Sequence, residues 1–289
     1  MPQFTAIREE STFVDLQGVT IHRYRWRPGR PKAVVLIAHG LGEHALRYEH
    51  VAQRLVQAGY AVWAIDQRGH GATGVTQHGG DLERLGRLGP GGMRAVVGDL
   101  VHVLKQIRAE HPGLPVAVLG HSWGSLSTQI LLNGYSDLVD AAILSGTAYR
   151  MPGSMNPGDL NARHAHLGDT GYEWISRDPA VVAAFAEDPL TFPAKVLPLF
   201  GVADGLRLYG VPKRIDPPIP MLIAGGSDDS MAGPKSLRRL GDAYRSRGGL
   251  TDVTVTVYPG ARHEILNEIN RAKVLDDIVA WLDARLLPA

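Results

Sequence analysis

Short apolar runs rich in Val, Ile and Leu recur along the chain. They lie at residues 33–38, 61–65, 116–119, 141–144, 221–224 and 253–257. Uninterrupted runs of this length are typical of strands that are covered on both faces, as in a parallel sheet. Residues 12–16 and 19–26 instead alternate apolar and polar positions around Gln17-Gly18, which predicts an antiparallel hairpin at a sheet edge.

Segments with the periodicity of an amphipathic helix lie between several of these apolar runs. The apolar residues between positions 97 and 107 fall on one stripe, and Pro112 closes that segment. Amphipathic helices are predicted at residues 94–110, 234–246 and 272–286. The alternation of strand and helix patterns predicts an α/β fold, with a mostly parallel central sheet of about eight strands flanked by helices.

Residues 150–218 interrupt the alternation. This segment contains no strand-like run, is rich in Pro and Gly, and carries aromatic residues among short helical stretches. The aromatic content argues against a disordered loop. We therefore expect a helical cap (lid), inserted between the sixth and seventh strands of an α/β core made of residues 1–149 and 219–289.

Composition excludes several classes of protein. The 289 residues include 30 Lys and Arg against 29 Asp and Glu, with no long run of one sign, so we expect no nucleic-acid partner. The absence of Cys excludes disulfides, thiol nucleophiles and zinc-thiolate sites. No apolar run has the length of a signal peptide or a transmembrane segment, and we therefore expect a cytoplasmic protein.

A candidate nucleophile lies where a predicted strand meets a predicted helix. Residues 120–124 read Gly-His-Ser-Trp-Gly, between the strand at 116–119 and an apolar helical segment at 126–132. This is the G-x-S-x-G nucleophile elbow, in which a sharp turn lifts the Ser122 hydroxyl clear of the sheet. Because the chain has 34 Gly, so short a pattern also arises by chance, and its surroundings decide the interpretation.

A serine nucleophile needs a histidine to take its proton and a carboxylate to orient that histidine. The chain supplies both in the order Ser, Asp, His, each just after a predicted strand. Asp228 and Asp229 follow the strand at 221–224, and His263 follows the strand at 253–257. Adjacent side chains of an extended segment point in opposite directions, so this reasoning leaves either aspartate as the acid.

The oxyanion of such a reaction is stabilised by backbone N–H groups. The elbow places one donor at Trp123, and the loop after the strand at 33–38 places the other at Leu41. We expect no metal, because no carboxylate lies at ligand spacing from His164 and His166, and we expect no cofactor.

One alternative function arises from the same loop. Gly40, Gly42 and Ala45 imitate a dinucleotide-binding fingerprint, with Asp66 about 20 residues further on. A nucleotide site would require the strand at 33–38 to be the first of the sheet, whereas a hairpin precedes it. It would also leave the serine, the aspartates and the histidine without a role, so we favour nucleophilic catalysis by the serine over nucleotide binding.

The chain resembles a known family at four places. The His-Gly-Leu-Gly-Glu-His loop at 39–44 with Arg47-Tyr48, the turn at 66–71, the elbow and the run at 262–268 resemble the monoacylglycerol lipase and lysophospholipase-like α/β-hydrolases. This group is also labelled serine aminopeptidase S33-like. The resemblance implies an α/β-hydrolase fold and a serine esterase that cleaves carboxylic esters of medium or long acyl chains through an acyl-enzyme intermediate, a monoacylglycerol-like lipid being the expected substrate.

The resemblance also implies roles for individual residues. Ser122 would attack, His263 would transfer the proton, and Asp229 would orient His263, because the family's G-x-x-D turn matches residues 226–229. The chain departs from the family in having Ser230 where Pro is usual. Apart from the resemblance, an apolar cluster in a segment with no sheet to cover predicts that the cap lines the acyl site and permits a transient membrane contact; its residues are Trp174, Ile175, Phe185, Phe192 and Leu206.

Two other functions remain open at this point. The same fold hosts cleavage of amides, lactones and carbon–carbon bonds with similar residues, and no sequence feature separates those bonds from esters. A non-catalytic binding module on this fold is the second alternative, against which the complete set of serine, acid and histidine argues.

Overall fold

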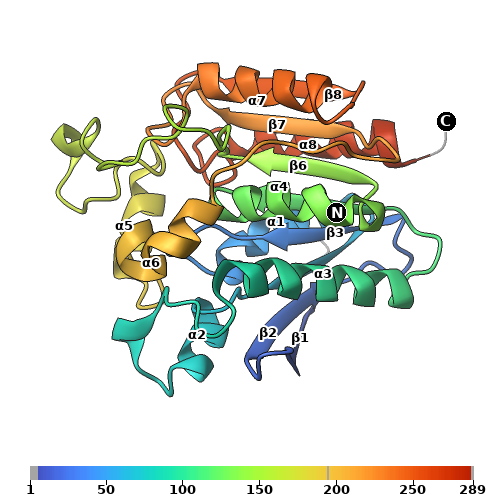
Figure 1. Ribbon diagram of the computed structural model, residues 1–289, viewed down its shortest axis with the longest axis horizontal. Coiled ribbons are helices and arrows are strands. Elements are labelled where there is room, and N and C mark those ends of the chain that lie inside the picture. The colour runs from blue at the N-terminus through green and yellow to red at the C-terminus, as the bar shows by residue number, and fades with distance from the viewer. Residues whose placement is uncertain (1–5, 194, 288–289) are drawn as a thin grey trace, which may run out of the picture.

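The computed structural model describes residues 6–193 and 195–287 and consists of a central sheet between two layers of helices (Figure 1). The eight strands have the order β1-β2-β4-β3-β5-β6-β7-β8. Their bounds are β1 Arg8–Val14, β2 Thr20–Trp26, β3 Ala33–Ala38, β4 Tyr60–Ile65, β5 Val116–His121, β6 Ala141–Ser145, β7 Met221–Gly226 and β8 Val253–Tyr258.

The predicted hairpin forms one edge of this sheet. β1 and β2 are antiparallel, β2 pairs antiparallel with β4, and every other neighbouring pair of strands is parallel. The Asp15 carboxylate closes the turn by accepting hydrogen bonds from the N–H groups of Gln17 and Val19, at 2.9 and 2.7 Å. The prediction of a mostly parallel sheet of eight strands with an edge hairpin is confirmed.

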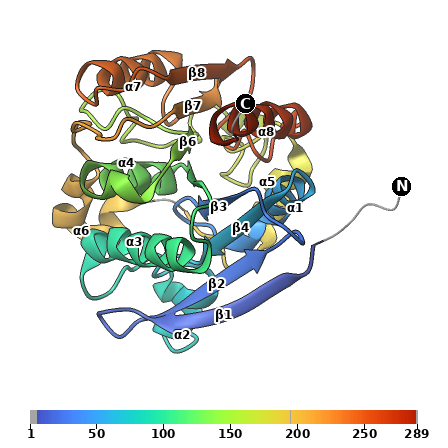
Figure 2. The same cartoon turned by 90° about the vertical axis from the view of Figure 1, so that its right-hand side faces the viewer.

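Helices cover both faces of the sheet (Figure 2). α1 and α8 pack on one face, and α3, α4 and α7 pack on the other. Every residue of β3 to β6 is buried, which explains why these strands read as continuous apolar runs. The helices are α1 Glu49–Gln57, α2 Gly71–Gln77, α3 Gly92–Glu110, α4 Trp123–Tyr135, α5 Pro179–Glu187, α6 Val196–Arg207, α7 Pro234–Ser246 and α8 Arg271–Leu286.

The loops after β3, β5, β7 and β8 leave the same edge of the sheet, because these strands are parallel. The segment between β6 and β7 contributes α5 and α6 and, within its described residues, no strand. In Figure 1 these two helices lie to the left of the sheet, at one end of the strands. In the described part of the chain, no helix combines the length and the apolar character needed to cross a membrane.

Candidate active site

Ser122 occupies the tight turn between β5 and α4. Its φ of 51° and ψ of −122° make it the one described residue other than glycine with a positive φ, a conformation that costs about 1–3 kcal/mol and persists where the surroundings enforce it. A Cβ at Gly120 would lie 2.6 Å from Thr128 Oγ1, and a Cβ at Gly124 would collide with the Ala38 carbonyl oxygen. Both flanking glycines are therefore required, as in a nucleophile elbow.

The loops after β7 and β8 bring an aspartate and a histidine together. Asp229 Oδ2 lies 2.9 Å from His263 Nδ1, and both side chains are buried. Asp229 Oδ1 accepts the Met231 N–H at 2.8 Å, which fixes the carboxylate. Asp228 points the other way and forms an ion pair with Arg163 of the β6–β7 segment. Of the two aspartates that the sequence left open, Asp229 is the one beside the histidine.

The other nitrogen of the histidine ring is free to act. His263 Nε2 is buried and has no hydrogen-bond partner among the described residues. The Ser122 hydroxyl meets Met231 Sδ at 3.9 Å instead. Ser122, His263 and Asp229 therefore lie together without a hydrogen bond between the serine and the histidine. Such catalytic hydrogen bonds are often long or poorly aligned when no substrate is bound.

The surroundings of His263 set its affinity for a proton. Burial alone lowers the pKa of His263, but the charge and hydrogen bond of Asp229, with the charges of Glu264 and Glu43, outweigh burial and raise this pKa above its ordinary value. His121 lies 4.9 Å away between ring centroids, and burial lowers its pKa well below the ordinary value, so His121 is neutral.

The loop after β3 lies against the nucleophile. A Cβ at Gly40 would come within 3.1 Å of Ser122 Cβ, so the next residue, Leu41, is close to the elbow. Leu41 and Trp123 are buried, and no protein acceptor is seen for either backbone N–H in the described part of the chain. Unused N–H groups at this place suit a developing oxyanion.

The predicted cap residues do not form one group. Trp174, Ile175 and Phe185 pack in one buried cluster, and the Trp174 ring covers His263 at 4.7 Å between centroids. Phe192 packs into a second cluster, while Leu206 is 64% exposed. The second cluster also contains Leu41, Leu88, Met93, Val96, Trp123, Ile130, Val196, Leu199, Phe200 and Leu208.

Asp66, which suggested a dinucleotide site, is fully engaged within the protein. Its buried carboxylate accepts hydrogen bonds from the N–H groups of Ala45 and Ala72 and from the Tyr24 hydroxyl, each at 2.8 Å. It therefore joins three segments of the fold and presents no free oxygen to a ribose. Within residues 6–193 and 195–287 no group of three or more His, Asp or Glu side chains is arranged to hold a metal ion.

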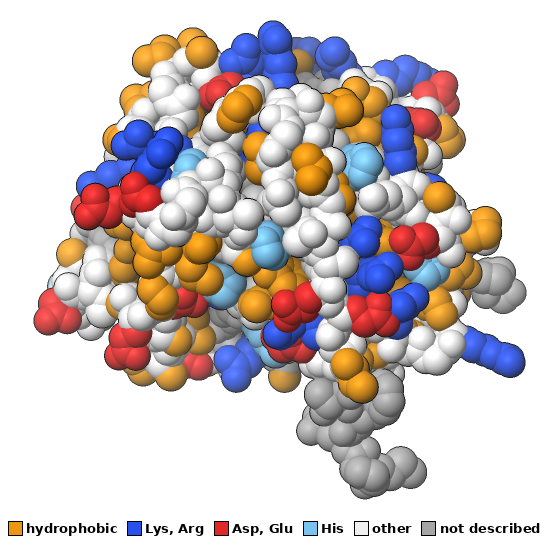
Figure 3. All heavy atoms as spheres, turned by 90° about the horizontal axis from the view of Figure 1, so that it is seen from below, with side chains coloured by type: hydrophobic (Ala, Val, Ile, Leu, Met, Phe, Trp, Pro, Cys, Tyr) orange, Lys and Arg blue, Asp and Glu red, His pale blue; other side chains and the backbone are white. Residues whose placement is uncertain are grey.

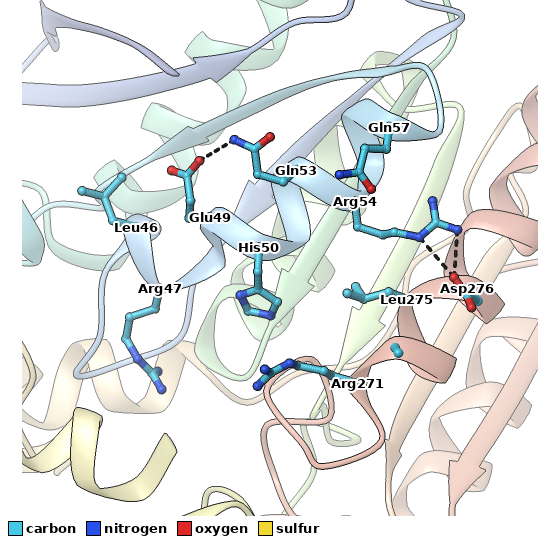
Figure 4. Close-up of a pocket in the computed structure, with 11 residues that line it drawn as sticks. Leu46, Arg47, Glu49, His50, Gln53, Arg54, Gln57, Arg271, Leu275 and Asp276 are labelled. Atoms are coloured by element: carbon cyan, nitrogen blue, oxygen red, sulfur yellow. Dashed lines mark hydrogen bonds and ion pairs between the residues drawn. The ribbon is translucent and has the colours of Figure 1, made fainter. Parts of the chain in front are cut away.

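A groove of about 640 Å³ lies away from the nucleophile, between α1 and α8 (Figure 4). Ser122, Asp229 and His263 do not line it. Arg47 lies at one end of the groove, and its guanidinium contacts Glu264, the residue after His263. The sequence patterns predicted no role for Arg47 or for its partners Glu43 and Glu264. All three residues lie in the motifs that carry the family resemblance.

Comparison with known proteins identifies the family. Residues 29–270 match the family described as serine aminopeptidase, S33. The chain is 34% identical to a monoacylglycerol lipase of Mycolicibacterium smegmatis over 98% of this chain and 99% of the relative, and 27% identical to the human monoglyceride lipase over 100% and 95%. A thermostable carboxyl esterase from Bacillus coagulans has the same fold, with a TM-score of 0.84, 24% identity, and coverage of 97% of this chain and 99% of the esterase. The chain belongs to the serine aminopeptidase S33 family of α/β-hydrolases and is an ester-cleaving serine hydrolase of the monoacylglycerol lipase type.

Proposed function

We propose that this hydrolase cleaves monoacylglycerol-like esters of medium or long acyl chains through an acyl-enzyme intermediate. The observation that carries the proposal is the contact of Asp229 with His263 beside a strained Ser122. The names of the relatives support the substrate class, since the bacterial and human relatives are a monoacylglycerol lipase and a monoglyceride lipase.

The reaction follows from the geometry of these groups. Ser122 Oγ attacks the ester carbonyl carbon as His263 Nε2 accepts the hydroxyl proton, and Asp229 stabilises the imidazolium that forms. The N–H groups of Leu41 and Trp123 bind the oxyanion of the tetrahedral intermediate. His263 then protonates the departing alcohol. In the second half, His263 takes a proton from water, the hydroxide attacks the acyl carbon, and the fatty acid leaves as Ser122 regains its proton.

The acyl chain of the substrate would lie against the cluster that contains Phe192. This cluster is apolar and includes both residues proposed as oxyanion donors, so a carbonyl bound there directs its alkyl chain along it. The Trp174 ring packs against the ring of His263, the residue that protonates the leaving alcohol in this reaction. We therefore assign Phe192 to the acyl site and Trp174 to the leaving-group side, and leave Ile175 and Phe185 as support for Trp174.

We also propose that residues 150–218 form a cap whose outer surface touches lipid. Gly201 has a φ of 72° and breaks α6 into two parts. α6 exposes Leu197, Val202 and Leu206 by 62%, 68% and 64%, and exposed apolar side chains gathered on one surface are typical of sites that contact a membrane or another protein. In Figure 3 hydrophobic side chains gather on the left of the face shown, the side on which α5 and α6 lie in Figure 1. The contact would be transient and would present substrate to the site.

The test is a substrate panel run on the full chain. p-Nitrophenyl esters of graded acyl length, a monoacylglycerol and the matching p-nitroanilides are compared, together with labelling by a fluorophosphonate. We expect turnover of esters, with preference for longer chains, and labelling that Ser122→Ala abolishes. Faster cleavage of the anilides would assign the site to amide bonds. The absence of both labelling and turnover would refute catalysis by this serine.

A further inference from the structure

A buried ionic cluster lies behind the proposed active site. The Arg47 guanidinium donates from Nη1 to Glu43 Oε2 at 2.6 Å and to Glu264 Oε1 at 2.7 Å, and from Nη2 to Glu264 Oε2 at 2.7 Å. The side chains of Arg47, Glu43 and Glu264 are 11%, 3% and 4% exposed. We call these three residues the Arg47 clamp.

Each end of the Arg47 clamp holds one loop of the site. Glu43 Oε1 accepts the Gly40 N–H at 2.6 Å and the Tyr48 hydroxyl at 2.7 Å, which shapes the loop that carries Leu41. Glu264 directly follows His263 in the chain, and its own N–H donates to the Ile175 carbonyl at 2.7 Å.

A further hydrogen bond lies within the loop after β8, which carries His263 and Glu264. Glu264 Oε2 accepts a second hydrogen bond from Asn267 Nδ2 at 2.8 Å, within that loop. The guanidinium of Arg47 also lies over the Phe185 ring of α5, 4.5 Å from its centroid. The Arg47 clamp therefore contacts the loop after β3, the loop after β8 and the β6–β7 segment together.

Because these charges are buried, the Arg47 clamp contributes little net free energy to the stability of the fold. Desolvation of buried charges offsets most of their mutual attraction, and an apolar replacement of similar volume is often as stable. A bidentate pair between arginine and carboxylate also fixes the geometry of the groups that it joins. The groups joined here are the two loops that carry the proposed oxyanion donor and the proposed base.

Resting on the proposed roles of Leu41 and His263, we propose that Arg47 and Glu264 are positioning residues of the reaction. The Arg47 clamp sets the distance and orientation between the oxyanion donor on one loop and the imidazole on the other. Glu264 has a second effect through its charge, because it is the clamp member adjacent to the base.

Charges from several elements act on His263. The burial of Glu264 raises its pKa, but the charge and hydrogen bonds of Arg47 outweigh burial and lower this pKa below the ordinary value, so Glu264 is ionised at neutral pH. Its charge is one of those that raise the pKa of His263. The titratable and charged groups around the imidazole are Asp229 after β7, His121 at the end of β5, Glu43 and Arg47 after β3, and Glu264 on its own loop.

Two variants separate geometry from charge. Glu264→Gln keeps the shape of the side chain and removes its charge, and Arg47→Lys keeps the charge and removes the bidentate geometry. Asp276→Asn is the matched control, since Asp276 pairs with Arg54 at 2.8 Å across the same groove between α1 and α8 (Figure 4) but touches neither loop. All are assayed with p-nitrophenyl acetate across pH, with circular dichroism and a thermal melt as checks of folding.

We expect both clamp variants to lose at least about tenfold in kcat with little change in KM, because the ground-state binding site is untouched while the reacting groups lose alignment. In Glu264→Gln the acid limb of kcat/KM should also move to lower pH by about 0.5 unit or more, since one negative charge near His263 is gone. In Arg47→Lys the limb should stay in place. The control variant should match the unmodified protein in both respects.

Full kcat in both folded clamp variants would overturn the inference. So would a loss of folding in both, which would assign the Arg47 clamp to stability alone, or a limb that stays fixed in Glu264→Gln. These outcomes are distinct from failure of the proposed function, which would appear as absence of ester turnover in the unmodified chain.

Discussion

Asp229 contacts the imidazole of His263 while its neighbour Asp228 faces away. Asp229 Oδ2 is 2.9 Å from His263 Nδ1 and the pair is buried, whereas the carboxylate of Asp228 is partly exposed and pairs with Arg163. Two adjacent carboxylates therefore have different surroundings, and substitution distinguishes their roles.

We predict that Asp229→Asn leaves the protein folded and lowers kcat by up to about 10⁴, because an amide cannot stabilise the imidazolium and can hold the ring in the wrong tautomer. Asp228→Asn should cost little, since it removes only a partly exposed ion pair. Steady-state kinetics with a p-nitrophenyl ester measure both. A crippled Asp228→Asn beside an active Asp229→Asn would reverse the assignment.

Replacement of the nucleophile should be the most damaging change. We expect Ser122→Ala to lower kcat by roughly 10⁴ to 10⁶ and to abolish fluorophosphonate labelling, because the oxyanion donors and the binding site cannot replace the attacking oxygen. Alanine must still adopt the positive φ of this turn, so a thermal melt is run alongside. Labelling that persists in this variant would place the nucleophile elsewhere.

The pH dependence follows from the electrostatics around the base. His263 must be neutral to accept the serine proton, and its surroundings raise its pKa above the ordinary value of a histidine. Activity should therefore fall as the pH falls through this raised pKa, with the acid limb of kcat/KM above about 6.5. A pH profile of kcat/KM on p-nitrophenyl acetate measures it, and a limb below that value would contradict the assignment.

The acyl site makes a prediction about chain length. We expect Phe192→Ala to raise KM for long-chain esters more than for acetate, because each buried methylene of the substrate contributes about 0.8 kcal/mol. Kinetics across the graded p-nitrophenyl esters test this.

Leu206→Ser is the matched control for the acyl site, since this side chain is exposed on the outer side of α6. It should leave KM unchanged for soluble esters of every length and weaken only turnover of a monoacylglycerol presented in phosphatidylcholine vesicles. An equal rise in KM across all lengths for Phe192→Ala would mean that this residue supports folding and not acyl binding.

Local patterns in the amino-acid sequence were enough to predict the strands, several helices and the nucleophile elbow. The segment at 33–38 is both the predicted run and the observed β3, and the same agreement holds for α7 at 234–246. These features are local, because burial on both faces selects continuous apolar runs, helix packing selects a 3.6-residue period, and a strand-to-helix turn selects glycines around Ser122. The order of the serine, aspartates and histidine, each after the end of a strand, was likewise predictable from the sequence, since parallel strands end at one edge of a sheet.

Contacts between residues that are distant in the sequence became known from the three-dimensional fold alone. The Arg47 side chain meets Glu264 across 217 positions of the chain, and no local periodicity records such a contact. The five apolar residues predicted for the cap were equivalent in the sequence, yet Phe192 packs in the cluster that contains Leu41 while Leu206 is exposed. The same holds for Asp228 and Asp229, because a one-residue step in an extended segment reverses the direction of the side chain, and only the fold places His263 on one of the two sides.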